Sequence, residues 1–240
     1  MKKIVSILFI LLLSSLAMTA NAPQNEAAFE ANRGSRVSWV RMKFPVYGQS
    51  NHESVWDWHN HVPADLRMLQ QMRQRTKINM KQEWNVVDVS KLDAMCNFPL
   101  LFFHGQRAIR LDQNAKNNIK EYVSRGGMLF IDDCVYDYEN QQDLFYRSMS
   151  SVLPQIFPGL RIERLTTNHE IFSCYYKLNR YPHVQGVNNG ISALYYNNRF
   201  IGVITSSDLH CAWINEWFSP KLHEQVYQMT MNIYIYCMTH

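Results

Sequence analysis

Polar side chains that can do chemistry follow apolar stretches at three places along the chain. His104 ends the stretch PLLFFH, Asp132 and Asp133 end GMLFIDD with Cys134 next to them, and Asp208 ends FIGVITSSD. Imidazole and carboxylate groups transfer protons or bind metal ions, and a cysteine thiolate is a nucleophile. These residue types therefore suggest two alternative functions, hydrolysis or the binding of a ligand.

Cys134 is the candidate nucleophile, because a thiolate at the turn after a strand gains from the N–H groups of a following helix. A nucleophile elbow is a strained turn that normally has glycine on both sides of the nucleophile, whereas Asp133 and Val135 flank Cys134. The charge of Asp133 also opposes a thiolate. We therefore interpret Cys134 as a small buried residue and predict no catalytic residue. A hydrolase that uses the polar strand ends is the alternative.

Asp132 and Asp133 are open to two interpretations. Two carboxylates that share a site raise the pKa of one of them, which suits acid–base chemistry, and their oxygens suit hard cations. One aspartate can instead cap the following helix or accept backbone N–H groups in the turn. We favour this second role for at least one of the two residues.

A histidine pair, His59 and His61, stands beside Asp57 in the stretch WDWHNHVP. Imidazole binds zinc or copper, so the stretch suggests a transition-metal site. Three close ligands are few, because a structural zinc site usually has four. We interpret the stretch as a surface loop, and we predict neither a metal site nor a cofactor.

The scaffold that positions the polar strand ends is predicted to be a parallel sheet. Leu100–Phe103 and Met128–Ile131 show no polar alternation, as expected of strands that are buried on both faces. A helical apolar period lies between them, with Asp112 as N-cap and Gly126 as C-terminal stop. This β-α-β unit should have a right-handed crossover.

Other periodic segments complete an α/β fold, which we predict to be a single domain with a mostly parallel sheet flanked by helices. We expect a strand at Val37–Phe44, a helix at Asp65–Thr76, a strand of uncertain pairing in INMKQEWNVVDV, a helix around 144–153, a strand at Phe200–Asp208 and a last helix from Ser219-Pro220. Ligands of such sheets bind outside the carboxyl ends of the strands. His104, Asp132, Asp133 and Asp208 should therefore gather at that edge.

The N-terminus predicts export. Lys2 and Lys3 precede the apolar run Ile4–Met18, and Ala20-Asn21-Ala22 has the small-x-small pattern of a cleavage site. The run is shorter than the ~20 residues of a comfortable membrane span. Residues 1–22 are therefore expected to be a signal peptide.

Pro23 directly follows the cleavage site and fits signal peptidase poorly, so a retained membrane anchor is the alternative. After the signal peptide we expect a flexible lead-in at 23–36 and one domain at 37–240. The predicted location is the periplasm or the outside of the cell.

Composition supports a folded domain. Hydrophobic residues make up 47% of the chain and aromatic residues 13%, which argues against disorder. The net charge of +4 is mild, and the lysine and arginine residues form no basic stripe along the sequence. We therefore predict no nucleic-acid partner. The five cysteines are scattered without a C-x-x-C motif, and their odd number leaves at least one thiol unpaired within the monomer.

Four blocks in a fixed order carry a family resemblance: FPLLFFHGQ, RGGMLFIDD, FPGLRIERLTTNHEIF and NIYIYCMTH. Together they resemble the domain of unknown function 4159 family, from about Trp39 to His240. That family is regarded as similar to the class I glutamine amidotransferase-like fold, so the resemblance implies a flavodoxin-like or amidotransferase-like domain. It implies no activity, because none is established for the family. Some relatives are encoded with MoxR-type ATPases and von Willebrand A-type proteins, which implies a cell-envelope assembly.

The amidotransferase triad also needs a downstream His-x-Glu pair. The chain instead has the direct neighbours His169-Glu170 and His223-Glu224, which on a strand point to opposite faces. His169 lies in the block that contains NHEIF, and it is either a base in a pocket or a residue that pins a loop through a hydrogen bond. From its place in this block we add His169 to the predicted ligand-binding residues and expect it at the carboxyl-end edge of the sheet, with His104, Asp132, Asp133 and Asp208.

The predicted function is that of an exported, non-catalytic ligand-binding or interaction domain in a cell-envelope assembly. Its expected partners are envelope proteins or a small ligand, and no nucleic acid. Membrane contact is expected only if the N-terminal segment is retained.

Overall fold

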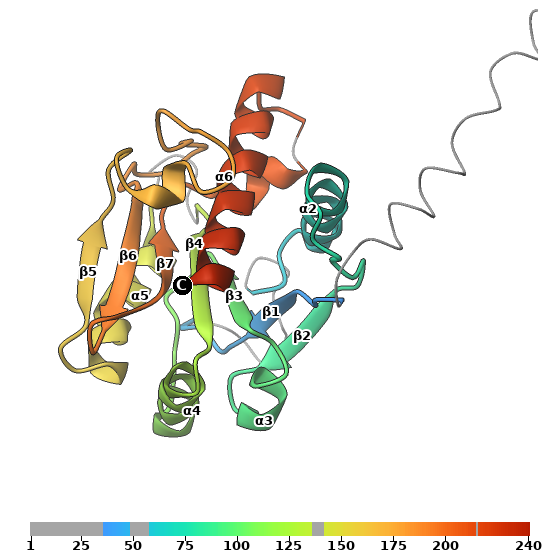
Figure 1. Ribbon diagram of the computed structural model, residues 1–240. Coiled ribbons are helices and arrows are strands. Elements are labelled where there is room, and N and C mark those ends of the chain that lie inside the picture. Colours follow the sequence, from blue (N-terminus) through green and yellow to red (C-terminus); the bar gives the residue numbers. More distant parts are fainter. Residues whose placement is uncertain (1–35, 49–57, 136–141, 215) are drawn as a thin grey trace, which may run out of the picture.

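Seven strands form one mixed sheet in the order β2-β1-β3-β4-β7-β6-β5 (Figure 1). The computed structural model describes residues 36–48, 58–135, 142–214 and 216–240. The predicted signal peptide and nearly all of the predicted lead-in lie outside these ranges, as does Asp57. None of the helices in the described ranges combines the length and apolar character that crossing a membrane requires.

The strands are β1 (Val40–Lys43), β2 (Asn85–Asp88), β3 (Leu100–Gly105), β4 (Met128–Asp133), β5 (Arg161–Arg164), β6 (Ile191–Tyr196) and β7 (Arg199–Thr205). The helices are α2 (Val62–Arg75), α3 (Leu92–Met95), α4 (Gln113–Ser124), α5 (Leu144–Ile156) and α6 (Pro220–Thr239), with short 3-10 turns η1 (Glu170–Phe172) and η2 (Cys211–Trp213).

The central part of the sheet is parallel. β2, β1, β3, β4 and β7 pair in parallel, whereas β6 and β5 extend the sheet in antiparallel pairs beyond β7. The first five strands in this order follow the flavodoxin-like arrangement, with β7 as its fifth strand. The predicted α/β class and the parallel neighbours Leu100–Phe103, Met128–Ile131 and Phe200–Thr205 are confirmed.

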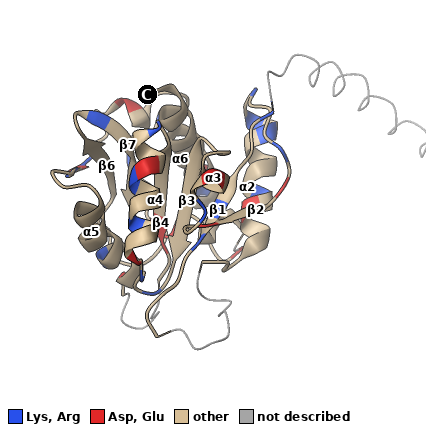
Figure 2. Ribbon diagram, turned by 90° about the horizontal axis from the view of Figure 1, so that it is seen from below, with Lys and Arg blue, Asp and Glu red and all other residues tan. Residues whose placement is uncertain are grey.

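Helices cover both faces of the sheet, which explains why β3 and β4 are buried throughout. α2 and α6 pack on the face that is in front in Figure 1, together with Phe102 and Phe130. α3, α4 and α5 pack on the other face, together with Phe103 and Ile131. The outer side of α4 carries charged residues of both signs (Figure 2).

The predicted helix boundaries follow from their caps. The side chain of Asp112 accepts a hydrogen bond from the backbone N–H of Ala115 at 2.8 Å, and α4 ends just before Gly126, whose φ is 101°. Ser219 caps α6 through the N–H of Leu222 at 3.3 Å. Both caps are confirmed, because each side-chain oxygen binds an N–H group that the helix leaves unpaired.

Some predicted boundaries were wrong. The first strand is only Val40–Lys43, and Val37 forms an isolated bridge with Met80 instead. α2 begins at Val62, before the expected Asp65, because Pro63 fits the first turn of a helix. β5, β6 and α3 were not predicted.

Candidate functional site

The polar ends of β3, β4 and β7 meet at the carboxyl-end side of the sheet. His104 lies beside Asp132 in register, and Asp132 lies beside Thr205 at the end of β7. Asp208 follows three residues beyond β7 and turns back towards His104 through a left-handed backbone conformation, with φ at 55°. The structure thus brings together His104, Asp132, Asp133 and Asp208, and all four are buried.

Asp132 and Asp133 point to opposite faces of the sheet, because side chains alternate along a strand. Asp132 accepts backbone N–H groups from His210 at 2.9 Å and Leu209 at 3.3 Å, and so pins the loop that follows β7. Asp133 accepts the N–H of Tyr146 at 2.6 Å, in the first turn of α5. The backbone-binding role that we favoured for at least one aspartate therefore holds for both, and they do not form one paired site.

Burial sets the charge state of these two carboxyl groups. It raises the pKa of Asp133 well above its ordinary value. Burial, with the nearby charge of Asp208, also raises the pKa of Asp132 to about 8. Both groups therefore hold protons more tightly than exposed aspartates do, which fits structural hydrogen bonding inside the fold.

His104 and Asp208 face each other without a hydrogen bond. The Nε2 atom of His104 lies 3.7 Å from Oδ1 of Asp208, and in the described part of the chain neither ring nitrogen of His104 finds a hydrogen-bond partner. Burial lowers the pKa of His104. Burial alone would raise the pKa of Asp208, but His104, Gln185 and Cys211 outweigh it and lower the pKa of Asp208 to about 2.

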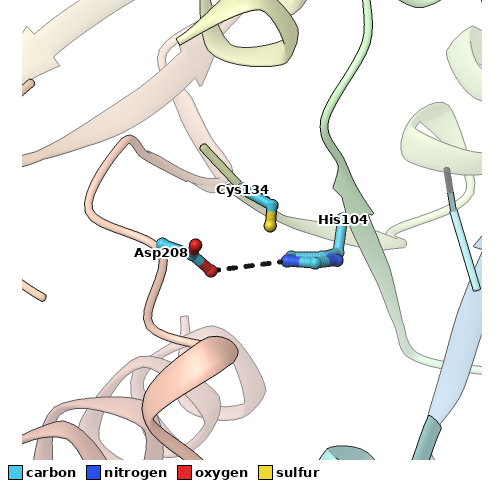
Figure 3. Close-up of side chains that lie close together, drawn as sticks. All are labelled: His104, Cys134 and Asp208. Carbon is cyan, nitrogen blue, oxygen red and sulfur yellow. Dashed lines mark ion pairs between the residues drawn. The ribbon is translucent and has the colours of Figure 1, made fainter. Parts of the chain in front are cut away.

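Cys134 completes a cluster with these two residues. One ligand atom each of His104, Cys134 and Asp208 lies within 4.8 Å of the others, and the three side chains converge (Figure 3). The Sγ of Cys134 accepts hydrogen bonds from Gln106 Nε2 at 3.3 Å and Asn60 Nδ2 at 3.7 Å. It also lies 3.9 Å from the Sγ of Cys211.

The thiol of Cys134 is poorly suited to nucleophilic attack. Only 2% of the residue is exposed. The contact with Cys211 lowers the pKa of Cys134, but burial and the charge of Asp208 prevail and raise it to about 11. The thiolate is the nucleophilic form, and a buried thiol with a raised pKa stays protonated. Cys134 should therefore be unreactive, as buried structural cysteines are.

A second buried network, which was not predicted from the sequence, adjoins the cluster. Arg41 on β1 is fully buried and donates to Asp65 on α2, to His210 Nε2 and to the carbonyl of Asn60 at 2.6 Å. Trp39 Nε1 donates to the other carboxylate oxygen of Asp65 at 2.9 Å. The signal was present in the sequence: one arginine inside a strand that is buried on both faces requires a buried counter-ion.

The remaining missed residues are Cys211, His210, Gln106 and Gln185, which contact the cluster from the loops after β3 and β7 and from the segment before β6. His210 and Cys211 lie two and three residues after Asp208 in the stretch SSDLHC. Cysteine and histidine so close to a polar strand end were the signal that the prediction overlooked.

His169 does not join the cluster, so its predicted place at the carboxyl-end edge of the sheet was wrong. Its Nδ1 accepts the N–H of Ile171 at 3.2 Å and caps η1. Its ring packs on Tyr236 with centroids 5.3 Å apart, and Tyr236 packs on Phe200 at the start of β7. His169 is therefore a loop-pinning residue near the amino end of β7, because packing on α6 places it there.

The stretch with His59 and His61 is partly buried rather than a surface loop. Trp58 and Asn60 are buried and their carbonyls accept hydrogen bonds from Arg41, while His59 and His61 are half-buried. The metal-suited group in the described ranges is His104, Cys134 and Asp208, and it includes neither histidine of this stretch.

Comparison with known proteins finds a family and no function. Residues 47–238 match the family model described as Domain of unknown function (DUF4159). A search of curated proteins gave no match. The likeness to the glutamine amidotransferase fold stays a prediction.

Proposed function

Because the chain belongs to the DUF4159 family, whose description assigns no activity, we propose a function from the chain's own site. The protein is an exported, non-catalytic ligand-binding or interaction domain that acts in a cell-envelope assembly. Its binding centre is the buried cluster of His104, Cys134 and Asp208 at the carboxyl ends of β3, β4 and β7.

The unbonded imidazole of His104 carries this proposal. A buried polar group without a hydrogen bond costs about 1–3 kcal/mol, so folded proteins rarely leave one. Both ring nitrogens of His104 are buried and lack a partner in the described ranges, and one of them faces a carboxylate at 3.7 Å. A ligand that binds between these side chains would remove that cost, whereas water-accessible catalysis would need an open site.

Export rests on the N-terminal pattern of Lys2, Lys3, the apolar run Ile4–Met18 and Ala20-Asn21-Ala22. We expect N-terminal sequencing of the protein from the envelope fraction to begin at Pro23. A full-length protein in the cytoplasm would contradict export. A full-length protein that stays in the membrane fraction would instead support the anchor in which Pro23 blocks cleavage.

A cysteine hydrolase is the second candidate function, since His104, Cys134 and Asp208 lie within 4.8 Å of one another. The two candidates differ in the reactivity of Cys134. We expect iodoacetamide at neutral pH to label the exposed Cys96 in the native protein and to label Cys134 only after denaturation. Cys96 is the internal control, because both thiols are in the same sample.

Fast, stoichiometric labelling of Cys134 in the folded protein would favour the hydrolase instead. The sites of labelling are read by peptide mass spectrometry after a second, isotopically distinct reagent marks the remaining thiols in denaturant. Circular dichroism before and after the first reaction shows that the fold is intact.

A further inference from the structure

We infer that the buried cluster is a zinc site, with His104 Nε2, Cys134 Sγ, a carboxylate oxygen of Asp208 and Cys211 Sγ as its ligands. The inference rests on the proposed function, because it names the ligand of the same non-catalytic centre. It differs from the prediction of no metal site, which weighed two other groups of residues: His59, His61 and Asp57, and the pair Asp132 and Asp133.

Two separations between donor atoms are close to those of a tetrahedral zinc site. Zinc–nitrogen and zinc–oxygen bonds of about 2.1 Å place two such ligands about 3.4 Å apart, and zinc–sulfur bonds of about 2.3 Å place two thiolates about 3.8 Å apart. His104 Nε2 and Asp208 Oδ1 are 3.7 Å apart, and the Sγ atoms of Cys134 and Cys211 are 3.9 Å apart. The donor atoms of His104, Cys134 and Asp208 all lie within 4.8 Å of one another, and Cys211, which is outside that group of three, joins the coordination when its side chain turns towards the ion.

The buried imidazole of His104, whose ring nitrogens have no hydrogen-bond partner in the described ranges, is the independent observation that points to a ligand. The 3.7 Å separation from Asp208 is too long for a hydrogen bond, yet the ring is fully buried and directed at the carboxylate (Figure 3). Two side chains that converge without bonding are expected when an ion lies between them. A mixed set of imidazole, thiolate and carboxylate is the donor chemistry that zinc accepts.

Cys211 is the fourth ligand by position and charge. Its Sγ contacts Cys134, and its backbone N–H donates to Asp208 Oδ1 at 3.3 Å, so it belongs to the same centre. Two thiolates and one carboxylate carry three negative charges, and a divalent cation would offset two of them in the dry interior. The four ligands come from the ends of β3 and β4 and from the turn after β7.

Neighbouring polar groups hold the ligands in place, as they do around known metal centres. The amide nitrogens of Gln106 and Asn60 donate to Cys134 Sγ, and amide donors to sulfur stabilise a thiolate. Gln185 Nε2 and the N–H of Val135 donate to Asp208 Oδ2, which leaves Oδ1 on the side of His104.

A site with four protein ligands is closed and therefore structural. The ion would tie together the carboxyl ends of β3, β4 and β7, three neighbouring strands of the parallel part of the sheet. This role agrees with a binding domain and not with turnover, because no coordination position remains for a substrate.

The test measures zinc in the mature protein and its binding after removal of metal by a chelator. We expect about one zinc per chain and, after replacement by Co²⁺, the thiolate-to-cobalt absorption and d–d bands of a tetrahedral site. His104→Ala, Cys134→Ser, Asp208→Asn and Cys211→Ser should each weaken zinc binding more than about 100-fold, and Gln106→Ala about 10–100-fold. Cys237→Ser, another buried cysteine, is the matched control and should bind as the native protein does.

Wild-type protein that is folded, metal-free and without cobalt bands would overturn the inference, and this arm needs no variant. A Cys134–Cys211 disulfide in peptides from the non-reduced protein would overturn it as well. If Cys134 also alkylates slowly, either of these two results overturns the zinc site and leaves the binding-domain proposal standing. Fast alkylation of Cys134 in the folded protein contradicts the binding-domain proposal itself. Undiminished zinc binding by Cys211→Ser would overturn the four-ligand site.

Discussion

Arg41→Met lowers the free energy of unfolding by about 3–5 kcal/mol, because it leaves the carboxylate of Asp65 buried without its counter-ion. Both side chains are fully buried, so solvent does not screen the loss. The change also removes the donors to the carbonyls of Trp58 and Asn60. Burial already disfavours both charges, since it lowers the pKa of Arg41 and raises the pKa of Asp65, and their pairing is the largest interaction that opposes this.

A double-mutant cycle with Asp65→Asn measures the coupling. Asparagine keeps an oxygen that can accept from Trp39, so this change removes mainly the charge. We expect Arg41→Met/Asp65→Asn to be less destabilised than Arg41→Met alone, because no unpaired charge remains. Equilibrium unfolding in urea gives each value.

The control for this cycle is Arg125→Met, which removes an exposed arginine from its i,i+4 pair with Glu121 and should not change the midpoint measurably. Strictly additive losses for the two buried changes would show that Arg41 and Asp65 do not act as a pair.

The sheet and its polar edge were predictable because the signals are local. Leu100–Phe103 and Met128–Ile131 lack alternation, and this alone predicts burial on both faces and a parallel pairing. The helix between them has its cap and its stop in the sequence. Once the strands are parallel, their carboxyl ends meet, so the approach of His104 to Asp132 follows from the fold.

The antiparallel extension had weaker signals. β5 is four residues long and mostly exposed, so it shows no apolar pattern. The turn between β6 and β7 did have a sequence signal, the pair Asn197-Asn198. Both residues have a positive φ in the structure, at 52° and 60°. Asparagine tolerates this conformation, and two such residues are typical of a tight hairpin.

The site itself could be predicted only in part, because its contacts join distant segments. Cys134 meets Cys211 across 77 residues, and no short motif encodes that pairing. Arg41 finds Asp65 only when α2 packs on the sheet. The prediction for His169 was wrong because it rested on a local sequence block, which suggested the carboxyl-end edge. The position of His169 is instead set by the packing of its ring on Tyr236 of α6.

Gly202→Ala should be the most destabilising single change in the sheet, with a loss of more than about 4 kcal/mol or a failure to fold. Gly202 lies within β7 at a φ of 140°, and it opposes Leu129 of β4. A Cβ atom there would lie 2.0 Å from the carbonyl oxygen of Leu129 and 2.7 Å from its backbone carbon and nitrogen. Backbone atoms of a central strand cannot move aside without breaking the ladder that holds both strands.

Gly159→Ala separates the close approach from the backbone conformation. Gly159 also has a positive φ, at 86°, but no atom lies within 4 Å of the added Cβ. It should therefore lose only the about 1–2 kcal/mol of a left-handed residue. Urea unfolding of both variants gives the comparison, and equal losses would show that the contact with Leu129 is not what requires glycine in β7. Because the β4–β7 spacing also sets where Asp208 and Cys211 stand relative to Cys134, any folded Gly202→Ala protein should bind zinc more weakly than the Gly159→Ala protein.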